Sequence, residues 1–362
     1  MRRYLFIFLY IILFFIQEIK AQDPVYSQFY YNRLELNPAF AGNDGGGKFR
    51  INSFHRNLYR PIKGPFNSTN FSIDYGLCQA NLGLGILASN ENQGDGYLQT
   101  NKIEGVLAGV IPFKRNGYFN WGFKYGYIFQ NLDWTKYTFS DQYDPILGIV
   151  RSSVNSNLVS DFSSAANWSS GLNVTGWNWK KTFAYNFGIV GNNLFSPSIG
   201  YLSPYRLPQR FTLYGGFTFH KNPAINASSG RLFFRFDKQY NYFTNIILSE
   251  YYFNNTLNIG LGCRLSIYNS ALFNNTSSII LSAGLQPHRS LKIIGSFESN
   301  IGGLNLIGAG NTFELGIVWV PEQEICSTNG LFNSFRGKRK GGSGGAKRMN
   351  CPVFGKDIIR QF

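Results

Sequence analysis

The chain has 362 residues, of which 15% are charged and 17% aromatic, with 40 glycines and a formal net charge of +15. A mean hydropathy of -0.15 excludes a bundle of membrane-spanning helices, and so low a charged fraction is unusual for a soluble enzyme. These values are typical of a transmembrane β-barrel, in which only every second residue of a strand faces lipid and aromatic residues gather at both interfaces. A soluble β-sandwich or solenoid is the alternative.

The first residues have the pattern of a secretory signal peptide. Arg2 and Arg3 precede an unbroken apolar run over residues 4–16, which is shorter than the ~20 residues that a spanning helix needs. We therefore predict a signal peptide over residues 1–21, cleaved after Ala21. Export argues against nucleic acid as a partner, so the positive charge favours an anionic glycolipid or an acidic protein.

Residues 48–320 alternate between apolar and small or polar side chains, as in the run LNIGLGCRLSI at 257–267. Several runs reach roughly 10–13 residues, close to the 9–11 of a tilted membrane strand. We predict an all-β fold, a 14-stranded antiparallel transmembrane β-barrel over 48–320 in the outer membrane. The predicted strands are 48–58, 67–77, 81–90, 100–112, 119–131, 164–176, 182–192, 208–220, 230–239, 242–253, 255–268, 277–286, 290–299 and 311–320.

An even strand number places both termini on the periplasmic side. Connections after odd strands include the long segments 132–163, 193–207 and 300–310, whereas connections after even strands are short. This asymmetry is expected of long extracellular loops and short periplasmic turns. The short 240–241 connection departs from the trend and suggests a miscounted strand.

Two segments flank the predicted barrel. Residues 22–47 are polar and aromatic, and we expect them to fold back into the lumen as a plug; a loose periplasmic leader is the alternative. Residues 321–362 form a basic, Gly-rich periplasmic tail of a composition that is usually solvated. Its basic patch includes Arg336, Lys338, Arg339 and Lys340.

The stretch from Gln22 to Gly42 reads QDPVYSQFYYNRLELNPAFAG. It resembles the opening signature of the PorP/SprF family of the Bacteroidetes type IX secretion and gliding-motility machinery, apart from Arg33, where a proline is usual. The later runs NLGLG at 81–85, FSDQ at 139–142, LPQRF at 207–211 and CPVF at 351–354 are similar to further landmarks of the family. The shared elements of the opening signature are Gln22, Asp23, Pro24, Ser27, Gln28, Leu36, Asn37, Pro38, Ala39, Ala41 and Gly42, of which Gln22, Asp23, Pro24, Ser27, Gln28, Asn37 and Pro38 are the candidate plug or partner-binding residues.

This resemblance implies an outer-membrane barrel related to FadL-type barrels that binds other proteins. It implies that the chain works with periplasmic and outer-membrane subunits of the secretion machinery and anchors a secreted surface adhesin or other type IX cargo. The main rival function is FadL-like transport of small hydrophobic molecules, which requires an apolar lumen pocket and a lateral opening. A soluble periplasmic β protein is a third possibility.

The sequence gives little support for catalysis. It contains no HExxH, GxSxG or P-loop motif, and its three histidines lie far apart. We predict that the chain is not an enzyme and needs no cofactor or metal. Asp133, Asp141 and Asp144 are weak candidates for a Ca²⁺ site, and a solvated loop is the favoured interpretation.

Charged residues at predicted inward positions either pair across the lumen or select solutes, and we favour pairing. These residues are Arg264, Lys292, Glu298 and Glu314. Among the four cysteines, Cys263 is expected to face lipid, and Cys78 ends a strand. Cys326 and Cys351 of the tail lie in an oxidising compartment, where a disulfide and free thiols both remain open.

Overall fold

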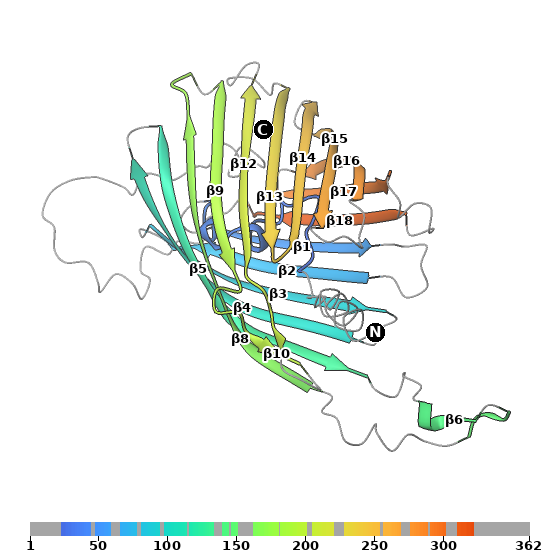
Figure 1. The fold of residues 1–362 in the computed structure, drawn as a ribbon. Coiled ribbons are helices and arrows are strands. Elements are labelled where there is room, and N and C mark those ends of the chain that lie inside the picture. Colours follow the sequence, from blue (N-terminus) through green and yellow to red (C-terminus); the bar gives the residue numbers. More distant parts are fainter. Residues whose placement is uncertain are drawn as a thin grey trace, which may run out of the picture.

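The computed structural model describes residues 23–44, 48–58, 66–77, 81–94, 98–113, 116–133, 140–144, 146–150, 162–180, 182–200, 205–220, 228–253, 256–268, 276–288, 290–301 and 310–321. These residues form a closed barrel of fourteen antiparallel strands with a segment of the chain inside it (Figure 1). Among the described residues, no helix has the length and apolar character needed to span a membrane.

Each barrel strand is hydrogen-bonded to its neighbours, and β18 pairs with β1 to close the ring. The barrel strands are β1 (Phe49–Leu58), β2 (Phe66–Gly76), β3 (Leu82–Gln93), β4 (Leu98–Phe113), β5 (Gly117–Leu132), β8 (Phe162–Trp177), β9 (Phe183–Asn192), β12 (Arg210–His220), β13 (Ser229–Gln239), β14 (Tyr242–Phe253), β15 (Leu257–Tyr268), β16 (Thr276–His288), β17 (Leu291–Asn300) and β18 (Asn311–Trp319).

The remaining short elements are not part of the barrel wall. The segment inside the barrel contains the helix α2 (Arg33–Leu36) and the 3-10 helix η1 (Pro38–Phe40). The connection after β9 forms the hairpin β10 (Ser198–Ile199) and β11 (Tyr205–Arg206). The connection after β5 contains η3 (Ser140–Gln142) and the pair β6 (Tyr143–Asp144) and β7 (Gly148–Ile149).

The period-two pattern of the sequence has its physical cause in the two faces of the wall. On β15, the outward Ile259 and Leu261 are 52% and 60% exposed, whereas the inward Asn258 is buried. Inward Asn120 and Asn173 are likewise buried. The apolar face therefore points to lipid and the polar face lines the lumen, as in membrane barrels and opposite to a soluble sandwich.

The predicted fourteen-strand barrel is confirmed, and every predicted strand boundary agrees with the structure within three residues. The connection at 240–241 is a two-residue turn between two genuine barrel strands, β13 and β14, with φ +53° at Tyr240. The suspicion of a miscounted strand was therefore wrong. Cys263 is exposed on the outer face, as expected.

Candidate functional site

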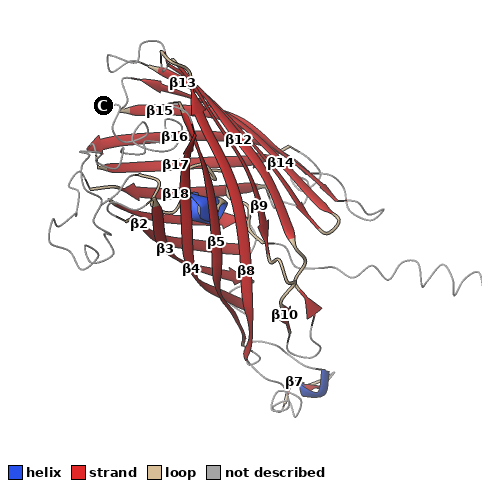
Figure 2. Ribbon diagram, turned by 90° about the vertical axis from the view of Figure 1, so that its left-hand side faces the viewer, coloured by secondary structure: helices blue, strands red, loops and turns tan. Residues whose placement is uncertain are grey.

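The lumen is occupied by residues 23–44, named here the luminal segment. Figures 1 and 2 show it crossing the inside of the barrel, with α2 and η1 surrounded by strands. Its aromatic residues Phe29, Tyr30 and Phe40 have no exposed surface. The segment therefore adds the main apolar packing to a lumen whose wall is polar.

At its N-terminal end, the segment is bound through the Asp23 carboxylate. Asp23 accepts hydrogen bonds from Lys102 Nζ at 2.6 Å, Asn193 Nδ2 at 2.8 Å and Gln239 Nε2 at 3.2 Å. Burial raises the pKa of Asp23, but Lys102 and Arg210 outweigh burial and hold this pKa well below its usual range. The carboxylate therefore stays ionised and ties β4, β13 and the connection after β9 to one point.

Asp23 lies at the barrel end that carries the longer connections. Lys102 is near the start of β4, and Gln239 is the last residue of β13. Strand β1 starts and β18 ends at the opposite end of the barrel. The predicted periplasmic position of both termini thus fits the first and last strands, but the luminal segment starts at the other end and runs back through the barrel.

Further along, backbone groups of the segment bind charged side chains of the wall. The amide N–H groups of Ser27 and Gln28 donate to Glu314, at 2.8 to 3.0 Å, and Glu314 also pairs with Arg56. Arg264 donates to the Val25 carbonyl at 2.9 Å, to Ser27 Oγ at 2.8 Å, and pairs with Glu298. Of the four inward charges named from the sequence, Arg264, Glu298 and Glu314 therefore form ion pairs along the wall, whereas Lys292 donates to tyrosine hydroxyls.

A buried tyrosine cluster joins the segment to β14 and β17. Tyr30 and Tyr31 donate to the Glu250 carboxylate, and Tyr31 also contacts the Tyr252 hydroxyl. Lys292 Nζ donates to the hydroxyls of Tyr31 and Tyr252, each at 2.7 Å. The Tyr30 ring stacks on Phe233 with centroids 4.1 Å apart.

The Asn37-Pro38-Ala39 motif and the residues after it pack against glycines of the wall. Asn37 Oδ1 accepts from the Ala39 N–H at 2.8 Å, and its Nδ2 donates to Tyr214 Oη at 2.8 Å. A Cβ at Gly122 would lie 2.3 Å from the Ala39 nitrogen, and a Cβ at Gly83 would lie 2.0 Å from the Ala41 oxygen. Only glycine permits this approach of two backbones.

At the far end, Asp44 lies between two arginines. Arg33 Nη1 donates to Asp44 Oδ1 at 3.1 Å, and Arg50 Nη1 donates to Asp44 Oδ2 at 2.9 Å. Burial raises the pKa of Asp44, but the two arginines outweigh burial and lower it. Arg33, which departs from the family pattern, thus belongs to an ion pair inside the segment.

The barrel end next to Asp23 is narrowed by the β10–β11 hairpin. Ile199 and Leu207 are buried against Ile128 of β5, and Gln130 donates to the Tyr205 hydroxyl at 3.4 Å. A cavity of about 170 Å³ remains between Asp23–Val25 of the luminal segment and strands β1–β3 and β14–β18. Its charged lining residues are Asp23, Arg56, Glu91, Arg264 and Glu298.

The candidate residues from the sequence fall into two groups. Six of them lie in the luminal segment: Asp23, Pro24, Ser27, Gln28, Asn37 and Pro38. The others lie outside the described residues: Gln22, Cys326, Cys351, Arg336, Lys338, Arg339 and Lys340, as does Cys78. The described residues contain no cluster of three side chains able to hold a metal ion. Asp144 instead accepts from the N–H groups of Ile146 and Leu147.

A family model described as "Type IX secretion system membrane protein PorP/SprF" matches residues 18–319. The chain belongs to the PorP/SprF family. It is thus an outer-membrane component of the type IX secretion system, and its fold is that of a membrane barrel. Among curated proteins, none matches the chain.

Solved structures with a similar fold include three hydrocarbon channels and transporters. The CymD monoaromatic hydrocarbon channel has 10% identity and a TM-score of 0.47, covering 82% of this chain and 94% of that chain. The toluene transporter TbuX of Ralstonia pickettii has 12% identity and a TM-score of 0.47, with coverages of 80% and 92%. TodX of Pseudomonas putida, another toluene transporter, has 8% identity and a TM-score of 0.47, with coverages of 86% and 100%.

Sequence reasoning missed two parts of this PorP/SprF site. It did not identify Glu250 as the acceptor for the tyrosines of the luminal segment, nor Gly83 and Gly122 as the places where the segment touches the wall. A signal for the glycines exists in the sequence, because each occupies an inward position of an alternating strand. Glu250 has the same periodicity, but its partners are more than 200 positions away.

Proposed function

We propose that this barrel binds a secreted surface protein, an adhesin or other type IX cargo, and holds it at the outer membrane. The observation that carries the proposal is the luminal segment, whose charged groups are paired with the wall at both ends, through Asp23 and Asp44. Removing it would leave several buried charges without partners, at roughly 3–5 kcal/mol for each broken pair. A barrel closed in its resting state suits an anchor better than a conduit.

The periplasmic side of the proposal rests on strand direction. The end where β1 starts and β18 ends carries the shorter connections, which in such barrels face the periplasm. The tail at 321–362 follows β18 and would therefore enter the periplasm. We propose that its basic patch contacts acidic subunits of the secretion machinery, and that a disulfide between Cys326 and Cys351 would present this patch as a loop.

The alternative, transport of small hydrophobic molecules, requires an apolar pocket and a lateral opening in the wall. The 170 Å³ cavity has charged and amide side chains in its lining, including Arg56, Glu91 and Asn92. All neighbouring barrel strands are hydrogen-bonded over most of their length, but residues 162–169 of β8 lie beyond the pairing with β9. The polar lining of the cavity favours the anchor over the transporter.

The test is purification of the tagged protein from its native outer membrane in a gentle detergent, with mass spectrometry of the associated proteins. We expect a large secreted surface protein together with secretion-machinery subunits. A barrel that carries only lipid or a small apolar ligand would contradict the proposal and favour transport.

A matched variant that ends at residue 320 separates the two contacts. If the tail binds the machinery, this variant loses the machinery subunits and keeps the secreted protein. Loss of neither class of partner would contradict the proposed role of the tail.

A further inference from the structure

Strand β8 extends past the end of its neighbour β9 at the barrel end next to Asp23. The whole of β8 from Phe162 is paired with β5, but β9 pairs only with Ser170–Trp177 (Figure 2). The part of β8 before Ser170 therefore has a barrel strand on one side and none on the other. Closed barrels normally have no such edge.

The edge begins where β9 turns away. Asn193 and Ser196 have φ values of +55° and +45°, and between them the Leu194 N–H donates to the Trp168 carbonyl at 3.0 Å. Asparagine tolerates this left-handed conformation, which ends the strand pairing. The chain then continues into β10, and Ile199 is buried inside the barrel.

Two residues of β8 present backbone groups along this edge. In an antiparallel strand, the N–H and C=O of one residue point to the same side, and the side alternates from residue to residue. Because the Trp168 carbonyl faces Leu194, the backbone groups of Ala166 and Ser164 face the same way. Within the described part of the chain, neither residue has a backbone partner on that side, and both are exposed.

The connection after β10 touches the inner face of β8 where the Gly200 N–H donates to Ser163 Oγ at 3.0 Å, but the sequence of the edge itself lacks the residues that normally prevent strand addition. Natural edges are protected by lysine, proline, inward charges or bulges. Residues 162–169 read FSSAANWS and contain no charged residue and no proline. The small outward side chains of Ser164 and Ala166 leave the edge open to a second backbone.

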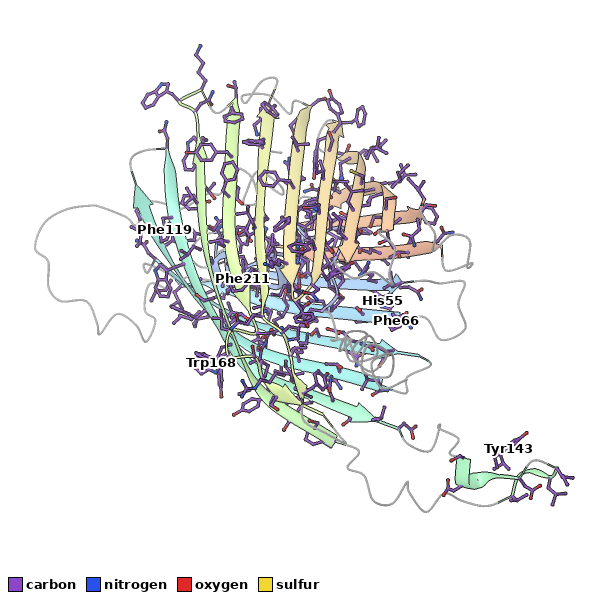
Figure 3. The ribbon with its side chains drawn as sticks, viewed as in Figure 1. His55, Phe66, Phe119, Tyr143, Trp168 and Phe211 are labelled. Atoms are coloured by element: carbon purple, nitrogen blue, oxygen red, sulfur yellow. The ribbon has the colours of Figure 1, made fainter. Side chains whose placement is uncertain are left out.

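A row of aromatic rings runs along the outer face beside this edge. Tyr125 and Trp168 have ring centroids 4.3 Å apart, and Phe195 packs edge-on against Trp168 at 6.2 Å. Figure 3 shows Trp168 pointing away from the barrel. The row consists of Phe195, Trp168, Tyr125, Tyr127, Phe129 and Phe162.

We propose that the free edge of β8 at Ser164–Ala166 binds an extended segment of the secreted protein as an added antiparallel or parallel strand. The unpaired backbone groups of Ser164 and Ala166 can be matched only by an extended chain. The aromatic row on the outer face favours apolar side chains at alternate positions of that chain, on the side that faces outward. On the inner side, the Gly200 N–H that follows β10 donates to Ser163 Oγ at 3.0 Å, and this contact favours small or polar side chains there. This inference rests on the proposed anchoring function and names its mode of recognition.

The test compares Ala166→Pro with Ala166→Val in the full chain, purified from the native outer membrane with its associated secreted protein. Proline removes the N–H that faces the free edge and leaves the pairing with β5 intact. Valine changes the same outward side chain and keeps the N–H. We expect Ala166→Pro to retain about ten-fold less secreted protein, the effect of losing one backbone hydrogen bond, and Ala166→Val to match the wild type.

Equal retention by the two variants would overturn the inference while leaving the anchoring function in place. A wild-type barrel without any secreted protein would remove both. Folding of each variant is checked by its heat-dependent mobility in gels. If Ala166→Pro does not fold, hydrogen–deuterium exchange of the wild type decides: slower exchange at Ser164 and Ala166 in the complex supports the inference, and unchanged exchange there overturns it.

Discussion

The Asn193 side chain donates to the Asp23 carboxylate at 2.8 Å, although the two residues are 170 positions apart in the sequence. Asn193 directly follows the last residue of β9, and Asp23 is the first described residue of the luminal segment. The same hydrogen bond therefore joins the inside of the barrel to the connection that leaves β8 with a free edge.

Replacing Asp23 by asparagine tests this connection. Asparagine keeps the shape of the side chain but removes the charge that Lys102 and Arg210 stabilise. Lys102 keeps Glu91 at 3.3 Å as a second partner, so we expect a loss of about 1–3 kcal/mol and a folded barrel. Hydrogen–deuterium exchange of residues 24–31 should accelerate about ten-fold or more. Asp144→Asn is the control, and equal exchange in the two variants would contradict the prediction.

A methyl group at Gly122 should prevent the luminal segment from reaching its position. The added Cβ would lie 2.3 Å from the Ala39 nitrogen and 2.4 Å from the Pro38 carbonyl carbon, both backbone atoms. Overpacking of this kind costs roughly 1–3 kcal/mol. We expect Gly122→Ala to show ion conductance in planar lipid bilayers, where the wild type is closed.

The matched control for this variant is Gly105→Ala. A Cβ at Gly105 on β4 would have its nearest neighbour, the Tyr125 carbonyl oxygen, at 3.8 Å, which is an ordinary contact. This variant should remain as closed as the wild type. Conductance of the same size in both variants would show that the luminal segment does not close the barrel.

The barrel could be predicted from the sequence because lipid imposes the same rule on every strand. Residues of β15 such as Ile259 and Leu261 face lipid whatever their neighbours are, so the period of two is visible in the sequence alone. The alternating pattern does not show that β5 and β8 extend past the end of β9. Their last residues continue the alternation, and only the turn at Asn193 decides where pairing stops.

The arrangement inside the lumen was much less predictable. The sequence indicates that Asp23, Arg264 and Glu314 belong to a polar interior, but not which groups they meet. Glu314 binds amides of the luminal segment from 287 positions away, and no local pattern encodes such a pair. The direction of the segment likewise depends on the ion pairs at its two ends, which form only when the barrel is closed.

The ion pair of Asp44 leads to a prediction about pH. Burial raises the pKa of Asp44, but Arg33 and Arg50 lower it below its value in the unfolded chain. A lowered pKa means that the stabilisation is complete above the unfolded pKa, about 3.9, and is lost as the pH falls through the folded value. Conductance should therefore stay absent from pH 8 to pH 5 and appear only in strong acid. Opening between pH 5 and pH 7 would be incompatible with this assignment.

Two substitutions at Asn193 separate its backbone role from its side-chain role. Valine is strained at a φ of +55°, whereas glycine adopts this conformation freely and loses only the hydrogen bonds to Asp23 and Pro208. We expect Asn193→Val to release the β10–β11 hairpin from Ile128 and to speed proteolysis within residues 198–207 severalfold. Asn193→Gly should have a smaller effect. If both variants are cleaved equally fast, the hydrogen bonds and not the backbone turn hold the hairpin, and β9 would then be free to extend along β8.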